Sequence, residues 1–166
     1  MQVDMRYAKG TSYLILRKEN FAMSVFGAGA YYDDDVTKDF LEGECFCIGY
    51  EKKDASALYE MLRRVKIGDI VYLKSFKMGK KGESGKIFIK AIGFVVGQNI
   101  KSLSFSDGSD MGYGRKVKWI KDYSDREDWF EIELNAEERV NNVYANTLYE
   151  EYSARIIKIV IDLLVS

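Results

Sequence analysis

The residues of this chain that are best suited to binding chemistry lie in one basic hairpin. Between Lys74 and Lys90 the chain has six lysines and a single glutamate, Glu83, so this segment carries a local charge of +5. Flexible lysines in a glycine-rich loop suit contacts with phosphate groups. We predict phosphate contacts from Lys77, Lys80, Lys81 and Lys86. A solvated loop that only keeps the hairpin soluble is the alternative.

A hydroxyl group and several aromatic side chains are candidates for a ligand pocket. Ser75 lies on the same strand face as Val71 and Leu73, so a polar group ends an otherwise apolar face, as in many small-ligand sites. The aromatic candidates are Phe26, Tyr31, Tyr32, Tyr50 and Trp119, with Trp129 as a partly exposed contact residue. For each of them, an ordinary core or loop position is the alternative.

The sequence lacks the residues that most catalytic and metal sites use. It contains no histidine, which removes the commonest general base and the commonest metal ligand. The acidic run Asp33, Asp34 and Asp35 suits the positive end of a short helix better than a metal site. Cys45 and Cys47 are expected to be reduced core residues, as in a cytoplasmic protein. We expect no catalysis, no cofactor and no metal.

The charge of the chain is polarised, although its total is close to neutral. The net charge is −1, so bulk electrostatics do not indicate a nucleic-acid partner. Residues 33–44 carry a net charge of −5, which offsets the +5 of the hairpin. A second basic cluster comprises Arg115, Lys116, Lys118 and Lys121. Any contact with nucleic acid must therefore come from a local basic patch.

Hydrophobic patterning predicts the elements that position these residues. Strands are expected over residues 12–17, 22–26, 45–50, 69–76, 86–98, 115–121 and 129–134, with a bend in the fifth at Gly93. Helices are expected over residues 33–40, after a cap at Asp54, and over residues 152–164. Turns or loops are expected at residues 27–32, 77–85, 99–114 and 135–146, and residues 147–150 fit either a short strand or a helical turn. We expect disorder at residues 1–10.

These elements predict a single α+β domain with a curved sheet or small barrel of about six strands. In the second helix Leu58, Met61, Leu62 and Val65 form one apolar stripe, with Glu60 and Arg64 paired on the surface and Gly68 at the C-terminal end. No membrane partner is expected, because charged residues interrupt the apolar C-terminus before a span of about 20 residues is reached.

The C-terminal helix is unusually apolar. Its polar residues form one narrow stripe, made of Glu151, Arg155, Lys158 and Asp162, and every other position is hydrophobic. A helix of this kind is expected to be buried on most sides, either against a sheet or at a dimer contact. The sequence therefore allows a homodimer through this helix.

Two segments of the chain resemble the PUA-like superfamily, in particular its EVE branch, to which YTH domains are related. They are residues 67–75, Ile-Gly-Asp-Ile-Val-Tyr-Leu-Lys-Ser, and residues 91–96, Ala-Ile-Gly-Phe-Val-Val. Those domains have a helix, a Gly-Asp-apolar strand that ends in a hydroxyl residue, a loop, and an apolar-Gly-apolar strand. Here residues 58–66 supply the helix, Ser75 the hydroxyl and Gly93 the glycine. The resemblance covers roughly residues 46–120.

The resemblance implies a domain that binds a modified or flipped-out base in a pocket, without catalysis. Aromatic faces stack the base, polar groups bind its edge and basic residues hold the backbone. In this chain the pocket would consist of Ser75, Tyr50, Trp119, Phe26 and Tyr31 or Tyr32. The tryptophan expected in the first strand is missing, and Lys74 stands where an aromatic residue often precedes the hydroxyl. A protein-interaction module that docks through the C-terminal helix is the alternative, and an enzyme acting on nucleotides is a weaker one.

Overall fold

The computed structural model describes residues 22–31, 33–98, 100–104, 107–144 and 146–166. This part of the chain contains eight strands: β1 (Val25–Gly29), β2 (Cys45–Cys47), β3 (Ile70–Lys77), β4 (Lys86–Val95), β5 (Lys101–Ser104), β6 (Asp110–Asp122), β7 (Phe130–Glu133) and β8 (Leu148–Glu150). It also contains four helices: α1 (Thr37–Glu42), α2 (Ser56–Arg64), α3 (Ala136–Tyr144) and α4 (Ala154–Val165). The predicted disorder of residues 1–10 and the strand at residues 12–17 lie outside the described residues.

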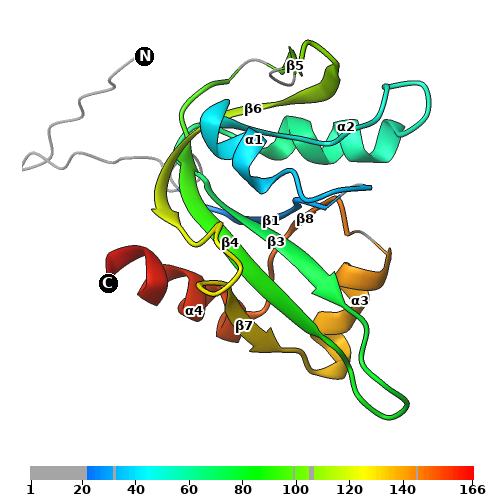
Figure 1. Cartoon of the computed structure of the whole chain (residues 1–166), viewed down its shortest axis with the longest axis vertical. Helices are drawn as coiled ribbons and strands as arrows, with labels where there is room; N and C mark the ends of the chain where they lie inside the picture. The colour runs from blue at the N-terminus through cyan, green and yellow to red at the C-terminus, as the bar shows by residue number, and fades with distance from the viewer. Residues whose placement is uncertain (1–21, 32, 99, 105–106, 145) are drawn as a thin grey trace, which may run out of the picture.

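The strands form one curled, mixed sheet flanked by helices (Figure 1). Its six-strand path follows the order β2-β6-β4-β3-β1-β8, with β5 attached to β6 and β7 attached to β4. β1 runs parallel to β3, and the other pairs are antiparallel. The predicted fold class is therefore confirmed, because the protein is an α+β structure with a curled six-strand sheet and a C-terminal helix.

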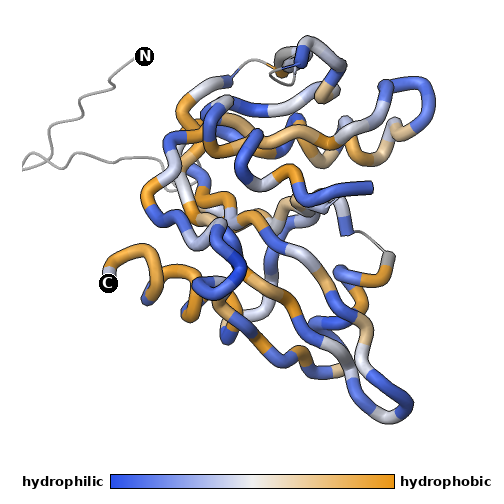
Figure 2. Tube along the Cα trace, in the orientation of Figure 1, coloured by the Kyte–Doolittle hydropathy of each residue, from blue (hydrophilic) through white to orange (hydrophobic). Residues whose placement is uncertain are grey.

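Hydrophobic side chains cover both faces of the sheet and form two cores. On β3, Val71 and Leu73 enter the core beneath α1 and α2, whereas Ile70 and Tyr72 enter the core beneath α4. This alternation follows from the two-residue period of a strand and was predicted from the sequence. Figure 2 shows hydrophobic residues along the central strands and in α4, and hydrophilic residues at the tip of the β3–β4 hairpin.

β4 changes its outer partner halfway along, and this change shapes the candidate site. Residues 86–89 pair with β7, whereas residues 91–95 pair with β6. Lys90 lies between these two segments. The ladder with β3 also skips one residue there, since Leu73 pairs with Ala91 and Lys74 pairs with Ile89. Such a bulge changes the direction of the side chains around it.

The glycine-rich turn predicted at residues 27–32 is wrong, because Gly27 and Gly29 belong to β1. The glycines are required by close packing. A Cβ atom on Gly27 would lie 2.7 Å from Cζ of Tyr149 and 2.8 Å from the hydroxyl oxygen of Tyr72. Small residues here mark a buried strand that passes close to two tyrosine rings, and this context could not be seen in the local sequence.

The first helix begins later than predicted. α1 starts at Thr37 and not at Asp33, because Asp35 is engaged elsewhere in the structure. Its Oδ2 pairs with Lys90 of β4, and its Oδ1 accepts a hydrogen bond of 3.0 Å from the backbone N–H of Thr37. The acidic run is therefore not the first turn of a helix, and its third member contributes to the candidate site.

The second helix differs from the prediction at its polar residues and at its C-terminal end. Asp54 does not cap α2, because Ala55 occupies the N-cap position and no side-chain cap hydrogen bond is present there within the described structure. Glu60 pairs with Arg63 instead of Arg64, because Arg64 pairs with Glu150 of β8. The helix ends at Arg64, so Gly68, four residues further on, is not its C-cap. The predicted apolar stripe is confirmed, and its members pack in the core beneath α2: Leu58, Met61, Leu62 and Val65.

Two segments that we predicted as loops contain regular structure. Within residues 99–114, β5 pairs with the first part of β6 as an antiparallel hairpin. Within residues 135–146, α3 follows a capping box in which Asn135 Oδ1 accepts from the Glu138 N–H at 2.9 Å and Glu138 Oε2 accepts from the Asn135 N–H at 3.0 Å. This Asn-x-x-Glu spacing is visible in the sequence and could have identified the helix.

The remaining predicted strands within the described residues are present with changed bounds. β1 begins three residues later than predicted, and β4 ends at Val95. β2 is shorter than predicted because it ends at Cys47, and β6 is longer because it begins at Asp110. β7 and β8 lie within the predicted segments. The expected bend at Gly93 coincides with a register shift between β4 and β6, where a Cβ atom would lie only 2.5 Å from the carbonyl oxygen of Lys118.

α4 forms close to the predicted residues, but only one face of it is buried. Ile156 and Val160 are completely covered by the sheet, whereas five other apolar residues stay partly exposed: Ile157, Ile159, Ile161, Leu163 and Leu164. The hydroxyl of Ser153 caps the helix by accepting from the Ile156 N–H. Among the described residues, no helix combines the length and the hydrophobicity that crossing a membrane requires.

Candidate functional site

A cavity of about 950 Å³ lies where the ends of β1 and β3 meet the first half of β4. The connection between β6 and β7 and the segment before β8 complete its wall. Its volume is at the upper end of the range for small-ligand sites, which is about 300–1,000 Å³. The cavity is therefore large enough for a planar group with a substituent.

Four aromatic side chains line this cavity: Tyr31, Phe76, Phe88 and Trp129. Phe88 and Trp129 contact each other, with ring centroids 5.6 Å apart and planes inclined at 51°. Tyr31 is 58% exposed, so most of its surface is free to contact a ligand. The rings come from three separate parts of the chain, and only the curled sheet brings them together. Aromatic walls of this kind suit a flat, unsaturated ligand.

Besides the ring of Phe88, three polar or charged groups hold Trp129 in place. Its indole N–H donates to the carbonyl oxygen of Ser124 at 3.3 Å. The ammonium group of Lys90 lies 4.3 Å from the ring centroid, and the guanidinium of Arg126 lies 5.7 Å from it. Cations at these distances are attracted to the negative face of an indole ring. The tryptophan is thus positioned before any ligand binds.

Lys90 is completely buried and forms an ion pair with Asp35 at 2.7 Å. Burial would raise the pKa of Asp35, but the hydrogen bonds from Lys90 and Thr37 outweigh burial and lower it. Burial lowers the pKa of Lys90, while the hydrogen bond that Lys90 donates to Asp35 opposes that shift. The pair connects β4 to the segment before α1 and fixes one wall of the cavity.

Lys74 is also completely buried, lines the cavity itself, and is held by neutral oxygens instead of a carboxylate. Its Nζ donates to the backbone oxygen of Asn146 at 2.9 Å and also to the Asn146 side-chain oxygen. The ring of Tyr149 lies 5.1 Å from the Nζ. No described carboxylate forms an ion pair with it. Burial lowers the pKa of Lys74 to about 7, and the charge of Glu151 only partly opposes this shift.

The charged side chains of the cavity wall favour an anionic ligand. Four are basic and two are acidic: Lys38, Lys74, Lys77 and Arg126 against Asp35 and Glu131. Both acidic groups are already paired with lysines, at Lys90 and Lys86. Within the described residues, Lys74, Lys77 and Arg126 have no acidic partner. The cavity therefore presents uncompensated positive charge beside its aromatic walls.

The structure brings together only some of the residues that we predicted for the pocket. Ser75 and Tyr31 line the cavity, and the Ser75 hydroxyl has no hydrogen-bond partner among the described residues. Tyr32 lies outside the described residues. Phe26, Tyr50 and Trp119 do not line the cavity.

Each of these three absences has a physical reason. Phe26 is 1% exposed, because it lies on β1 in the core beneath α1 and α2. Trp119 packs against the same core, and its indole N–H donates to the carbonyl of Phe40 at 2.9 Å. Tyr50 is 49% exposed beyond the end of β2, where its carbonyl accepts from the hydroxyl of Tyr59.

The predicted phosphate-binding lysines divide between two hollows. Lys77 lines the cavity and also a smaller hollow of about 520 Å³ beneath the hairpin loop, which Lys80 and Lys86 line as well. Lys81 is exposed at the hairpin tip and lines neither hollow. Lys86 pairs with Glu131, so it is less available to a phosphate than the others.

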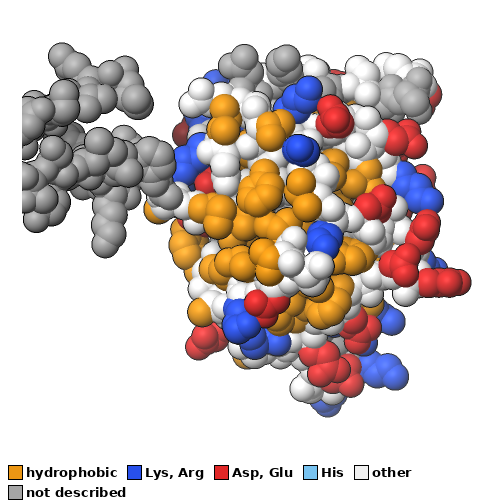
Figure 3. Space-filling model, turned by 90° about the vertical axis from the view of Figure 1, so that its left-hand side faces the viewer, with side chains coloured by type: hydrophobic (Ala, Val, Ile, Leu, Met, Phe, Trp, Pro, Cys, Tyr) orange, Lys and Arg blue, Asp and Glu red, His pale blue; other side chains and the backbone are white. Residues whose placement is uncertain are grey.

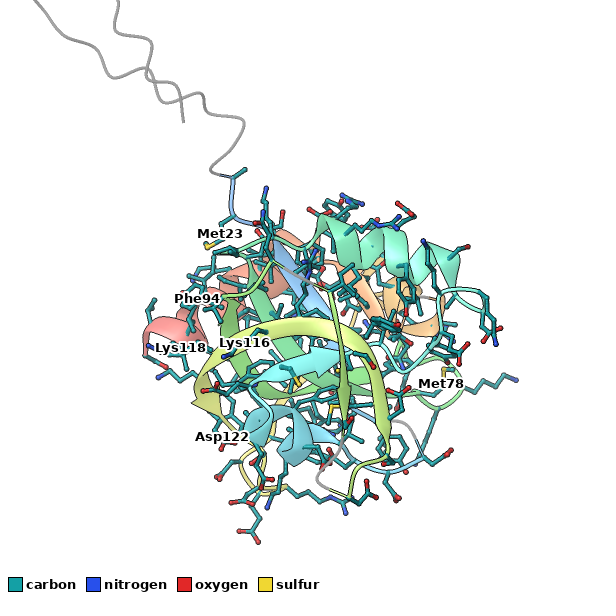
Figure 4. All side chains as sticks on the ribbon, turned by 90° about the horizontal axis from the view of Figure 1, so that it is seen from above. Met23, Met78, Phe94, Lys116, Lys118 and Asp122 are labelled. Atoms are coloured by element: carbon teal, nitrogen blue, oxygen red, sulfur yellow. The ribbon has the colours of Figure 1, made fainter. Side chains whose placement is uncertain are left out.

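The residues of the second basic cluster, Arg115, Lys116, Lys118 and Lys121, do not form one continuous basic surface. Arg115 is buried, because its guanidinium donates to the carbonyl of Leu62 at the end of α2. Lys116 lies 3.6 Å from a carboxylate oxygen of Glu44. Lys118 is exposed on the outer side of β6, far from the hairpin residue Met78 (Figure 4).

Sequence reasoning missed several residues of the cavity wall. They are Phe76, Phe88, Arg126 and Asn146, together with Trp129 and Lys74, which we had considered in other roles. Phe76 and Phe88 could have been proposed from the sequence, because both lie on the two strands that flank the basic loop. In the β3–β4 ladder Phe76 pairs with Ile87, and Phe88 pairs with Ser75. Nothing local points to Asn146, since its contact with Lys74 spans 72 residues.

Comparison with known proteins assigns no family to this chain. A scan against protein-family models found no match, and a search of the curated proteins found none either. Among the described residues, no group of three or more histidine, cysteine, aspartate or glutamate side chains is arranged to hold a metal ion.

Proposed function

We propose that this chain is a PUA-like, EVE-like domain that binds nucleic acid by taking one extruded or modified base into the cavity, without catalysis. One observation carries the proposal: a cavity walled by four aromatic rings also presents cations that have no acidic partner among the described side chains. Stacking on aromatic side chains and contact between cations and phosphates are the two main interactions of single nucleotides with proteins.

Each part of the cavity has a role in this proposal. Trp129, Phe88 and Tyr31 would contact the faces of the base. Ser75, whose hydroxyl is free within the described structure, would hydrogen-bond its edge. Lys77 would bind the adjoining phosphate, because it lies between the cavity and the smaller hollow. Lys80 in that smaller hollow would extend the phosphate contacts along the strand.

The proposal predicts that Trp129→Leu weakens binding about tenfold or more. Loss of one base–aromatic contact costs about 1–3 kcal/mol, which corresponds to about 5- to 150-fold in affinity. The measurement is a fluorescence-anisotropy titration of labelled single-stranded oligonucleotides, at about 50 and 150 mM salt. Trp119→Phe serves as the control, because Trp119 lies outside the cavity, and circular dichroism confirms that both variants fold.

Two outcomes of this titration would contradict the proposal. Absence of binding by the wild-type protein at low salt removes nucleic acid as a partner. Equal affinities of the Trp129 and Trp119 variants remove the cavity from the interaction. Binding that does not weaken with salt would instead remove the lysines, since phosphate contacts release counterions.

The alternative function, docking of a second copy of the chain through α4, also has one observation in its favour. Figure 3 shows a broad hydrophobic surface on the side of the molecule that carries α4. Phe94 of β4 packs partly exposed beside α4, and Ile120 of β6 is 44% exposed. Patches of this extent often mark interaction sites. Size-exclusion chromatography with light scattering separates the two functions, because a monomer at all concentrations excludes this dimer.

A further inference from the structure

Two fully buried lysines, Lys74 in the cavity wall and Lys90 beside it, differ in one respect that has consequences for the ligand. Lys90 has a carboxylate partner in Asp35 at 2.7 Å. Lys74 is equally buried, but the oxygens that accept its hydrogen bonds are the two neutral oxygens of Asn146. Lysine is almost never fully buried unless it is paired with an acidic group. Lys90 is thus a compensated cation, whereas Lys74, the buried lysine of the wall, has no direct acidic partner among the described residues.

Glu151, whose charge acts on Lys74, does not supply that missing charge by direct contact. Glu151 is buried, and one of its oxygens accepts from the Tyr72 hydroxyl at 2.8 Å. Its other oxygen accepts from the Ser153 N–H at 2.9 Å. Its charge reaches Lys74 only through space. Placing an ammonium group in such surroundings is unfavourable by several kcal/mol unless an anion contacts it.

The position of Lys74 allows a ligand to provide the anion. Lys74, Ser75 and Asn146 all line the cavity. Asn146 is exposed, so its side-chain oxygen can release Lys74 and hydrogen-bond to water without disrupting the hydrophobic core. An acidic oxygen of a bound ligand could take the place of that amide oxygen, and a charged acceptor binds an ammonium group more strongly than a neutral one.

We propose that Lys74 and Asn146 form a subsite for an acidic substituent, so that the cavity selects a base that carries a carboxylate over a neutral base. This inference rests on the proposed function, because it assumes that a base enters the cavity. The aromatic walls hold the ring, and Lys74 pairs with the carboxylate at the cavity wall. Asp35 and Glu131 do not repel such a ligand strongly, because each is already paired with a lysine.

Three oligonucleotides of identical sequence test the inference, with 5-carboxycytosine, 5-methylcytosine or cytosine at one central position. Wild-type protein is expected to bind the carboxylated oligonucleotide about tenfold more tightly than the methylated one. Lys74→Met is expected to bind both with equal affinity. Lys77→Met is the matched control, because it removes an exposed cation at the rim and should weaken all three complexes alike. Denaturation of both variants verifies folding.

The outcomes distinguish a failure of this inference from a failure of the proposed function. Equal wild-type affinities for the three oligonucleotides overturn the carboxylate subsite and leave base binding intact. A preference that persists in Lys74→Met also overturns it. A cytosine oligonucleotide with a 5′-terminal phosphate completes the set. If Lys74 proves to recognise that phosphate and not the carboxylate, the proposed ligand is wrong. Absence of binding to every oligonucleotide overturns both proposals.

Discussion

Replacing Lys74 by methionine is expected to stabilise the protein at pH 7 by about 1–4 kcal/mol, although the residue is completely buried. The substitution removes an amine that burial disfavours and keeps a side chain of similar length in the same space. Replacement of buried charged groups by well-packed apolar ones is often stabilising by about 1–4 kcal/mol. Asn146, the partner of Lys74, is exposed, so its oxygens can bind water once the amine is gone.

The stabilisation by Lys74→Met is expected to decrease as the pH rises. Burial lowers the pKa of Lys74 to about 7 in the folded protein, whereas an unfolded lysine has a pKa of about 10.4. Between these values the unfolded chain holds a proton that the folded chain lacks. Raising the pH through this window therefore stabilises wild-type protein relative to its unfolded state. The variant lacks this gain in stability. The amount by which Lys74→Met exceeds wild type in unfolding free energy is therefore largest at pH 7 and below and smallest near pH 10.

Urea denaturation of both proteins at pH 7, 8, 9 and 10, followed by tryptophan fluorescence, measures this effect. Comparing wild type with variant at each pH cancels the titration of every group that both proteins share. A difference in unfolding free energy that stays constant from pH 7 to 10 would show that Lys74 keeps an ordinary pKa. A variant less stable than wild type at pH 7 would show that the amine stabilises the fold.

The same substitution at Lys90 is expected to have the opposite sign, with a loss of about 2 kcal/mol. Lys90→Met leaves Asp35 without its ion-pair partner and removes the cation that contacts the Trp129 ring. Breaking a fully buried pair costs about 3–5 kcal/mol, and the loss is smaller here because the Asp35 side chain is 34% exposed. The measurement is urea denaturation at pH 7 under identical conditions.

A double variant isolates the ion pair from the loss of packing. Asp35→Asn combined with Lys90→Met removes both charges, so it is expected to recover part of the stability that Lys90→Met loses. If the single variant Lys90→Met is as stable as wild type, the structural role of the ion pair is contradicted. Opposite effects of one substitution at two equally buried lysines would establish that their partners, and not burial itself, decide the outcome.

The sequence was sufficient to predict the hairpin of β3 and β4 and the helix α4. Both have clear periodicity, because β3 alternates between two cores and α4 has one narrow polar stripe. The capping box of α3 was equally visible, at Asn135 and Glu138, and was missed. Local patterns of this kind are set by neighbouring residues, so no knowledge of the tertiary structure is needed to identify them.

The candidate site depended on contacts that local patterns do not contain. Lys74 and Lys90 were counted with the exposed charge of the hairpin, yet both are buried. A bulge in β4 changes the alternation there, and the partners Asn146 and Asp35 are distant in the sequence. The same applies to the aromatic residues. Trp119 alternates like a core residue and proves to be one, whereas Trp129 becomes a cavity wall only because β4 changes partners beside it.

The most direct test of base binding in this cavity is photocrosslinking with an oligonucleotide that carries 5-iodouracil. This base couples on irradiation to an aromatic side chain that it contacts, and mass spectrometry of the digested complex identifies the residue. We predict crosslinks at Tyr31, Phe76, Phe88 or Trp129, the four rings of the cavity. Crosslinks confined to aromatic residues on other surfaces, such as Tyr50, Tyr113 or Tyr152, would show that the base binds elsewhere and would contradict the central claim.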